Sequence, residues 1–194
     1  NDPRITLGVP PSGNANFLWV QHFAHHLSPN GQAGFVMPNG ALAVSGKEGE
    51  LRQKLIDADL VDVIVSCPSK LFYNVSLPVS LWFLAKNKGG DRFRNRKGET
   101  LFIDARDTFE QISKRQVVFT KEHIAKITDT VRSWRGEKGA PKYEDVSGFC
   151  KSANLEEIKK NGYTLTPGRY VGLADIEDDG ISFEEKMQKL SSEL

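Results

Sequence analysis

The sequence predicts an α/β fold in which helices cover both faces of a sheet. Short apolar or β-branched runs alternate with helical patterns along the first half of the chain, which is typical of such a sheet. One connection between two runs is too short to hold a crossover helix, so we expect an antiparallel pair there. The runs lie at residues 33–38, 61–67, 77–85 and 100–104, and the helical patterns at residues 14–27 and 50–58.

The first predicted helix spans residues 14–27 and precedes the first strand. Breaker-rich segments flank about four turns of sequence, which favours a helix. Its apolar residues cover most of its circumference, so we expect this helix to be largely buried. The run at residues 33–38 is short, apolar and closed by Pro38-Asn39-Gly40, which predicts a buried strand.

A second helix and two further strands follow. Leu51, Leu55 and Ala58 are spaced four and three residues apart, which places them on one face of a helix. The β-branched run at residues 61–67 predicts a strand. Only nine residues separate it from the run at residues 77–85, whereas a parallel crossover needs about a dozen or more. We therefore expect these two strands to be antiparallel.

Helical patterns dominate after the fourth strand. Thr120 can cap a helix that carries an apolar stripe on one side. The stripe consists of Ile124, Ile127, Val131 and Trp134. A glycine-rich loop follows, and a short helix at residues 154–161 stops at Gly162.

The chain closes on another helical pattern. A capping box at residues 182–185 opens a helix with one apolar face. That face consists of Phe183, Met187, Leu190 and Leu194. We therefore divide the chain into a sheet-forming part, residues 1–107, and a mainly helical extension, residues 108–194.

Length and composition fit one domain of ordinary size, with or without a small appendage. The chain has 194 residues, and 39% of them are hydrophobic, which is enough to bury a core. Two cysteines are too few for a disulfide framework or a cysteine-rich zinc site. The apolar runs are too short to span a bilayer and no leader precedes them, so we expect a soluble, cytoplasmic protein without a membrane partner. The chain lacks an initiator Met, so we expect a piece of a longer protein.

Charge is unevenly distributed, although the formal net charge is only +1. Residues 86–97 contain six basic residues and one acid, whereas residues 175–194 contain seven acids and two lysines. The basic loop follows a strand, and it is either a phosphate contact or a solvated hairpin tip that discourages edge pairing. Its basic residues are Lys86, Lys88, Arg92, Arg94, Arg96 and Lys97.

Few familiar catalytic patterns occur. His22 and His26 share one helix face, but no Glu follows the first and no third ligand suggests itself, so we expect no metal site and interpret them as polar-edge residues. The sequence also lacks a Gly-x-Ser-x-Gly elbow, a Walker sequence and a Gly-x-Gly-x-x-Gly turn. Neither a serine elbow nor a glycine-rich phosphate loop is therefore a candidate.

The segment Leu71-Phe72-Tyr73-Asn74 is the most unusual stretch of the chain. Two adjacent aromatic residues and an amide lie in a connection between two predicted strands. Side chains of an extended segment alternate between faces, so both rings cannot enter the same core layer. An exposed ring beside an amide can stack on a nucleobase and hydrogen-bond its edge. Packing of the loop against its own domain is the alternative.

Several segments together resemble the modification (methyltransferase) subunit of type I restriction–modification systems. That family comprises N6-adenine DNA methyltransferases that use S-adenosylmethionine. The resemblance runs from about residue 2 to the end, and the order of the segments makes it specific. The segments lie at residues 14–17 (NANF), 31–40 (GQAGFVMPNG), 70–74 (KLFYN), 101–106 (LFIDAR), 134–136 (WRG) and 165–172 (LTPGRYVG).

For the fold, the resemblance implies the C-terminal portion of a seven-stranded methyltransferase sheet whose last strand is antiparallel. The runs at residues 33–38, 61–67 and 77–85 resemble its final three strands. The family's methyl-donor motif and its catalytic Asn-Pro-Pro-Phe are absent from this sequence. No catalytic residue can therefore be assigned, and we expect this part to be inactive alone, with S-adenosylmethionine a cofactor of the full-length enzyme.

For individual residues, the resemblance implies two aromatic contacts. Phe17 matches an aromatic residue that packs against the adenine of the methyl donor. Phe72 matches the residue that stacks on the extruded target adenine, and Tyr73 and Asn74 help to hold that base. The implied partners are double-stranded DNA, a specificity subunit and a restriction subunit. The helices of residues 108–194 either contact another subunit or pack on their own domain.

A noncatalytic assembly or DNA-scaffolding module that keeps the methyltransferase shape is the alternative function. The sequence that precedes Asn1 in a longer protein distinguishes the two hypotheses. An intact Asn-Pro-Pro-Phe there favours the enzyme, and a degenerate motif favours the scaffold.

Overall fold

A five-stranded mixed sheet with the strand order β1-β3-β2-β4-β7 organises the computed structural model, which describes residues 2–90 and 92–173. β2 and β4 are parallel, and the other three neighbouring pairs are antiparallel. The antiparallel pairing of β2 with β3 confirms the prediction from the short connection. The strands are β1 (Gln32–Pro38), β2 (Val61–Ser66), β3 (Val79–Ala85), β4 (Glu99–Asp104) and β7 (Cys150–Asn154).

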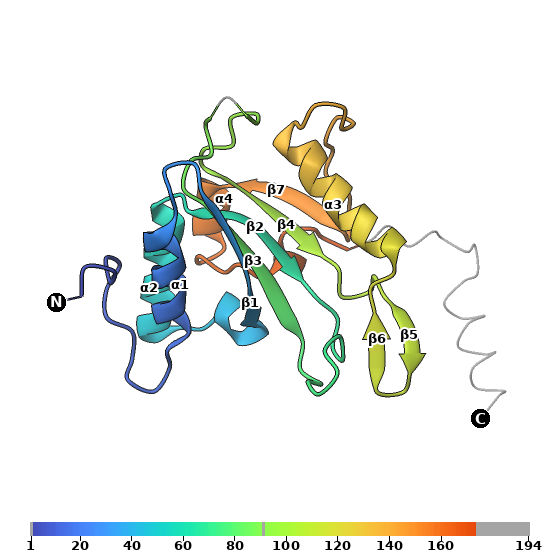
Figure 1. The fold of residues 1–194 in the computed structure, drawn as a ribbon, viewed down its shortest axis with the longest axis horizontal. Helices are drawn as coiled ribbons and strands as arrows, with labels where there is room; N and C mark the ends of the chain where they lie inside the picture. Colours follow the sequence, from blue (N-terminus) through green and yellow to red (C-terminus); the bar gives the residue numbers. More distant parts are fainter. Residues whose placement is uncertain (1, 91, 174–194) are drawn as a thin grey trace, which may run out of the picture.

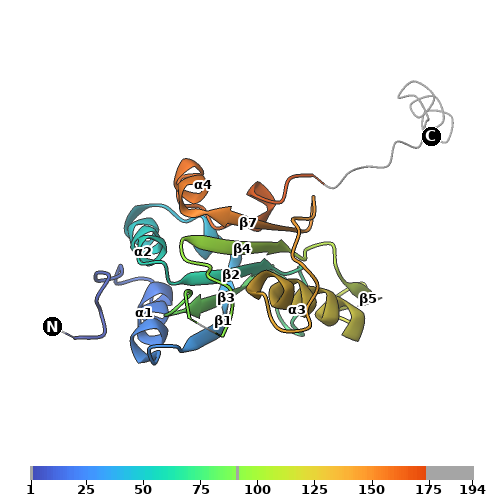
Figure 2. The ribbon, with the colours of Figure 1, turned by 90° about the horizontal axis from the view of Figure 1, so that it is seen from above.

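Helices cover both faces of this sheet, as the alternating pattern predicts (Figures 1 and 2). One face carries three α-helices and two short 3-10 helices, and the other carries α3. The first group comprises α1 (Asn16–His26), α2 (Gly46–Asp57), α4 (Leu155–Lys160), η1 (Asn39–Leu42) and η2 (Pro167–Arg169). α3 spans Lys121–Arg135. α3 begins directly after its predicted cap, Thr120, whereas α2 begins at Gly46, four residues before the predicted position 50.

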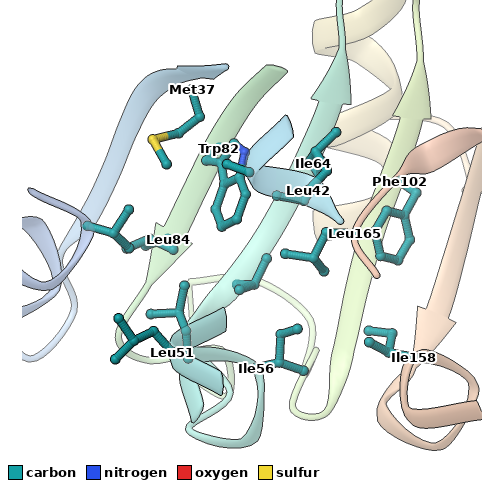
Figure 3. Close-up of a cluster of buried hydrophobic side chains, with 14 of the residues drawn as sticks. Met37, Leu42, Leu51, Ile56, Ile64, Trp82, Leu84, Phe102, Ile158 and Leu165 are labelled. Atoms are coloured by element: carbon teal, nitrogen blue, oxygen red, sulfur yellow. The ribbon is translucent and has the colours of Figure 1, made fainter. Parts of the chain in front are cut away.

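Alternating side chains of the central strands build two separate cores. Ile64 of β2, Trp82 of β3 and Phe102 of β4 point into the core beneath α1, α2 and α4 (Figure 3). Val65 of β2 and Ile103 of β4 point to the opposite core beneath α3. This two-sided burial explains why apolar residues of the central strands occur at adjacent positions and not only at every second one.

β1 differs from its prediction as a buried strand. It lies at the edge of the sheet, and most of its side chains are exposed or half-buried. A short apolar run does not distinguish a central strand from an edge strand, because both need β-branched or apolar residues on at least one face. Gly34 is required here, since a Cβ at this position would lie 2.9 Å from the Phe83 ring.

α1 is less buried than its composition predicts. Phe17, Val20 and Gln21 are its buried residues, whereas Trp19 is 59% and Phe23 is 40% exposed. The helix packs near the β1 edge of the sheet, so only one side of it finds a partner among the described residues. The ring of Phe23 stacks on Phe35 of β1, with 4.6 Å between their centroids.

α3 packs on its own domain through the predicted stripe. The Thr120 hydroxyl accepts a hydrogen bond from the His123 backbone N–H at 3.3 Å, which confirms the predicted cap. Trp134 is fully buried, and Ile127 and Val131 pack against the same core. Ile124 is half-exposed, so the stripe faces the sheet more closely towards its C-terminal end.

The expectation of a mainly helical extension from residue 108 is not confirmed. That part of the chain also forms the hairpin of β5 (Glu110–Ser113) and β6 (Gln116–Val118), and it supplies β7, which pairs with β4 in the main sheet. β7 has no β-branched residue, so only its pairing with β4 makes it a strand. The role of residues 108–194 as a separate subunit-contact region stays a prediction, as does the seven-stranded sheet.

Two remaining expectations have different outcomes. α4 confirms the predicted short helix, and Gly162 follows it with a positive φ of 64°. The helix predicted from the capping box at residues 182–185 lies outside the described residues. Within the described residues, no helix has both the length and the apolar composition needed to cross a bilayer.

Candidate functional site

β1, β2 and β4 end on the same side of the sheet, which is drawn at the bottom of Figure 1. We call this side the carboxyl edge, as distinct from the edge strands β1 and β7. These three strands run in the same direction, because β1 and β2 are each antiparallel to β3. In α/β sheets this edge is where ligands bind, since the loops that leave the strands converge there. The loop at residues 67–78, which contains Phe72, Tyr73 and Asn74, begins at this edge.

The loop at residues 67–78 presents its aromatic residues to solvent. A tight turn closes when the Val75 backbone N–H donates to the Phe72 carbonyl at 3.1 Å. Phe72 is 42% exposed and Tyr73 is 82% exposed, and the next residue, Asn74, is exposed as well. This exposure favours the prediction of a ligand-binding segment over simple loop packing, because large apolar side chains in solvent are available for a partner.

The base of the loop is fixed while its tip is exposed. Cys67 and Pro68 are buried, and the Cys67 N–H donates to the Val79 carbonyl at 2.9 Å. Burial also raises the pKa of the Cys67 thiol to about 11, so this thiol stays protonated at neutral pH and is no candidate nucleophile. Pro78 cannot donate a ladder hydrogen bond, which explains why β3 begins at Val79 rather than at the predicted residue 77.

A carboxylate–guanidinium pair follows β4 at the same edge. The Arg106 Nη2 lies 2.6 Å from Asp104 Oδ2, and its Nε donates to Asp104 Oδ1 at 2.8 Å. The Asp104 carboxylate raises the pKa of Arg106 through this hydrogen-bonded pair. Gly168 lies against the pair, because a Cβ there would approach Arg106 Nη2 to 2.8 Å. The structure thus brings together two segments, 101–106 and 165–172, that are far apart in the sequence.

Phe17 lies in the core rather than on a surface. It is only 1% exposed, and its ring meets Trp82 edge-on with 6.1 Å between the centroids. Among the described residues it therefore offers no free face to the adenine of a methyl donor. The burial of Phe17 therefore does not fit its predicted contact with S-adenosylmethionine.

The basic loop at residues 86–97 lies at the opposite end of the sheet from the loop at residues 67–78, which we call the Phe72 loop (Figure 1). Lys88 is buried and forms an ion pair with Asp59 at 2.6 Å. Burial lowers the pKa of the Lys88 ammonium, and the Asp59 carboxylate opposes that effect. Arg94 pairs with Glu99 at 2.6 Å. The basic residues of the loop with exposed side chains are Lys86, Arg92 and Lys97.

Arg96, also in this loop, belongs to a buried ion cluster. Its guanidinium lies 3.3 Å from Asp62 Oδ1, and Arg135 of α3 lies 2.7 Å from Asp62 Oδ2. The rings of Phe93 and Trp134 each lie with their centroids 5.3 Å from the Arg96 guanidinium carbon. Lys88 and Arg96 therefore hold the loop to the sheet and to α3, and their prediction as phosphate contacts does not fit their burial.

The histidines of α1 do not assemble a metal site in the described part of the chain. The His22 and His26 rings stack with 6.2 Å between their centroids, and His26 Nδ1 hydrogen-bonds the His22 carbonyl at 2.8 Å. Within residues 2–90 and 92–173, no group of three or more His, Cys, Asp or Glu side chains could hold a metal ion.

Sequence reasoning missed the β5–β6 hairpin beside the Phe72 loop. The Val117 N–H donates to the Lys70 carbonyl at 3.2 Å, and Lys70 Nζ donates to the Lys114 carbonyl at 2.9 Å. A signal was present, because a polar Ser113-Lys114-Arg115 turn separates two short runs that contain β-branched residues. The candidate site therefore comprises the Phe72 loop, the Asp104–Arg106 pair and this hairpin.

Comparison with known proteins gives consistent matches. Residues 1–179 match the family described as N-6 DNA Methylase. The type I restriction enzyme MjaIX methylase subunit of Methanocaldococcus jannaschii is 53% identical over 199 residues, covering 100% of this chain and 35% of that protein. The HindI methylase subunit of Haemophilus influenzae is 49% identical, covering 100% of this chain and 42% of that protein. The chain thus spans less than half the length of these curated relatives.

Solved structures give the same result. The methyltransferase subunit of a type I restriction–modification system from Streptococcus thermophilus has a TM-score of 0.76 at 31% identity, covering 89% of this chain and 34% of that one. The EcoKI M protein has a TM-score of 0.64 at 19% identity, covering 95% of this chain and 43% of that one, and supports the fold alone. This chain therefore belongs to the N-6 DNA methylase family and is similar over its whole length to the methylase subunits of type I restriction enzymes.

Proposed function

We propose that the complete protein transfers a methyl group from S-adenosylmethionine to N6 of adenine in DNA, and that this chain supplies the surface for the target base. Family membership supports a DNA methyltransferase. The exposed turn of Phe72 and Tyr73 at the carboxyl edge of the sheet is the observation that supports placing the surface for the target adenine there. The partners of the complete protein are then double-stranded DNA, a specificity subunit and a restriction subunit, because the relatives are subunits of type I restriction enzymes.

The chemistry of the substrate explains why such a surface is needed. The N6 amino group of adenine lies inside the duplex, so the base has to leave the stack before the group can react. Extrusion loses base stacking, and an aromatic ring that stacks on the extruded base offsets part of that loss. Phe72 provides a ring for this contact. The Asn74 amide can both donate to and accept from the edge of the base.

The described residues contain only part of the proposed enzyme. The sequence has no Asn-Pro-Pro-Phe, and Phe17 is buried, so it offers no free ring face to a methyl donor. We therefore propose that this chain alone transfers no methyl group, and that the amide which contacts the reacting N6 belongs to the remainder of a longer protein.

Phe72→Ala in the complete protein should lower kcat/KM for methyl transfer to DNA by about 5- to 150-fold. This range corresponds to a loss of about 1–3 kcal/mol of base–aromatic stacking. The assay follows transfer of a radiolabelled methyl group from S-adenosylmethionine to a duplex. The methylated sequence used in that duplex is first identified by sequencing N6-methyladenine in DNA from cells that express the system.

Phe23→Ala is the matched control, because Phe23 is a similarly exposed ring (40%) on α1. Its kcat/KM should stay within about twofold of the unaltered protein, since surface changes away from a site have small effects. Equal losses in the two variants would contradict a role of Phe72 in base stacking. DNA binding without any methyl transfer by the complete protein would contradict the enzymatic function and support a scaffolding module.

A further inference from the structure

We propose that the tip of the β5–β6 hairpin binds the DNA phosphate backbone beside the extruded base. This inference rests on the proposed function. It places the phosphate contact on the hairpin, whereas the sequence predicted such a contact at residues 86–97. The hairpin comprises residues 110–118, and its tip carries Lys114 and Arg115. Four observations support the assignment: the unpaired charges of the tip, the hydrogen bonds within it, its hydrogen-bonded connection to the Phe72 loop, and its position at the carboxyl edge of the sheet.

The charges of the hairpin tip are available to a ligand. Lys114 and Arg115 are exposed, and every residue of β5 is exposed as well. Within the described residues, neither of these two side chains forms an ion pair. Glu110 is the acidic residue of the hairpin, and it pairs with Val118 at the end away from the tip. Adjacent unpaired cations of this kind bind phosphate oxygens, and Arg can do so with two hydrogen bonds.

Two hydrogen bonds stabilise the turn at the tip. The Arg115 N–H donates to the Ser113 hydroxyl at 3.2 Å, and the Gln111 amide donates to the Ser113 carbonyl at 3.1 Å. A tip that is ordered before binding loses less conformational entropy when it meets DNA.

The hairpin is also attached to the loop that carries Phe72. Lys70, two residues before Phe72, accepts a hydrogen bond from the Val117 N–H and donates one from its Nζ to the Lys114 carbonyl. The position of the cationic tip is thereby fixed relative to the aromatic turn. Phosphate contacts set the register of a protein on DNA, so a tip fixed in this way would place the target nucleotide at Phe72.

Position favours the hairpin over the basic loop. Both the Phe72 loop and the hairpin lie at the lower edge of the sheet in Figure 1, whereas the loop at residues 86–97 lies at the upper edge. Lys88 and Arg96 of that loop are buried in ion pairs. A duplex that delivers a base to Phe72 therefore meets Lys114 and Arg115 before it meets the basic loop.

The test is the salt dependence of DNA binding by the complete protein in its complex. A fluorescent 30-base-pair duplex that contains the methylated sequence is titrated at several KCl concentrations, and log Kd is plotted against log salt. Each phosphate contact contributes about 0.9 to the slope, so Lys114→Gln/Arg115→Gln should reduce the slope by about 2. Lys114→Glu/Arg115→Glu should reduce it at least as much.

Lys159→Glu/Lys160→Glu, at the end of α4, is the matched control for the charge reversal. It changes the net charge by the same amount at two exposed positions outside the candidate site. Its slope should equal that of the unaltered protein. Equal slopes for the hairpin variants and the unaltered protein, or equal reductions in hairpin and control variants, would overturn the assignment.

The binding measurement needs no methyl transfer, so it separates the two proposals. If the hairpin variants show the predicted change of slope but the unaltered protein transfers no methyl group, the enzymatic function is contradicted and the hairpin contact is supported. Absence of salt-dependent DNA binding by the unaltered protein would contradict both.

Discussion

Asp62→Ala should lower the free energy of unfolding of this chain by about 3–5 kcal/mol, because it would leave the buried Arg96 and the partly buried Arg135 without their counter-charge. Asp62 is fully buried on β2. One of its oxygens lies 3.3 Å from Arg96 and the other lies 2.7 Å from Arg135. Urea denaturation measures the change, and the midpoint should move while the slope of the transition stays constant.

Asp129→Ala provides the matched control for Asp62. Asp129 is an exposed aspartate on α3 that pairs with Arg132 at 3.3 Å. An exposed pair contributes about 0–1 kcal/mol, because solvent screens it. Similar losses in the two variants would show that the Asp62 cluster does not hold the basic loop and α3 to the sheet.

Trp82→Ala should lower the free energy of unfolding by about 3–5 kcal/mol through lost burial and the cavity left behind. Trp82 is fully buried on β3 and meets Phe17 edge-on. Its indole N–H donates to the Ser80 hydroxyl at 3.0 Å, so the variant also loses a buried hydrogen bond. The measurement is again urea denaturation, followed by far-ultraviolet circular dichroism because a tryptophan is removed.

Trp19→Ala removes the same side chain from an exposed position on α1. Its effect should stay below about 1 kcal/mol, since most of this side chain is already in water. A loss at Trp19 as large as that at Trp82 would contradict the assignment of the main core to the face covered by α1 and α2.

Hydrophobic periodicity was sufficient to predict the central elements. The runs that became β2, β3 and β4 and the helices α2, α3 and α4 all carry local signals: β-branched residues, apolar spacing of three and four, and caps. β7 carries none of these signals, because Cys150-Lys151-Ser152-Ala153-Asn154 becomes a strand only through pairing with β4. The edge position of β1 likewise depends on which strands pair, and a single run does not encode that.

The candidate site was predictable in part, for a similar reason. Phe72, Tyr73 and Asn74 stand out because two aromatic residues in a short connection have no common core to enter. The basic loop was misleading, because the partner of Arg96 lies 34 residues earlier in the chain and Arg135 lies 73 residues after Asp62. A run of cations looks the same in the sequence whether its charges are free or buried against a distant carboxylate.

Photo-crosslinking tests most directly whether the Phe72 loop receives the target base. A duplex with 5-iodouracil in place of the target adenine is bound to the complete protein and irradiated, which joins the base to the side chain in contact with it. An unpaired base leaves the duplex readily, so the substitution favours extrusion. We predict that mass spectrometry of the digested complex identifies a cross-link to Phe72 or Tyr73. A cross-link confined to residues 86–97, or to a peptide outside this chain, would contradict the proposed role of the loop.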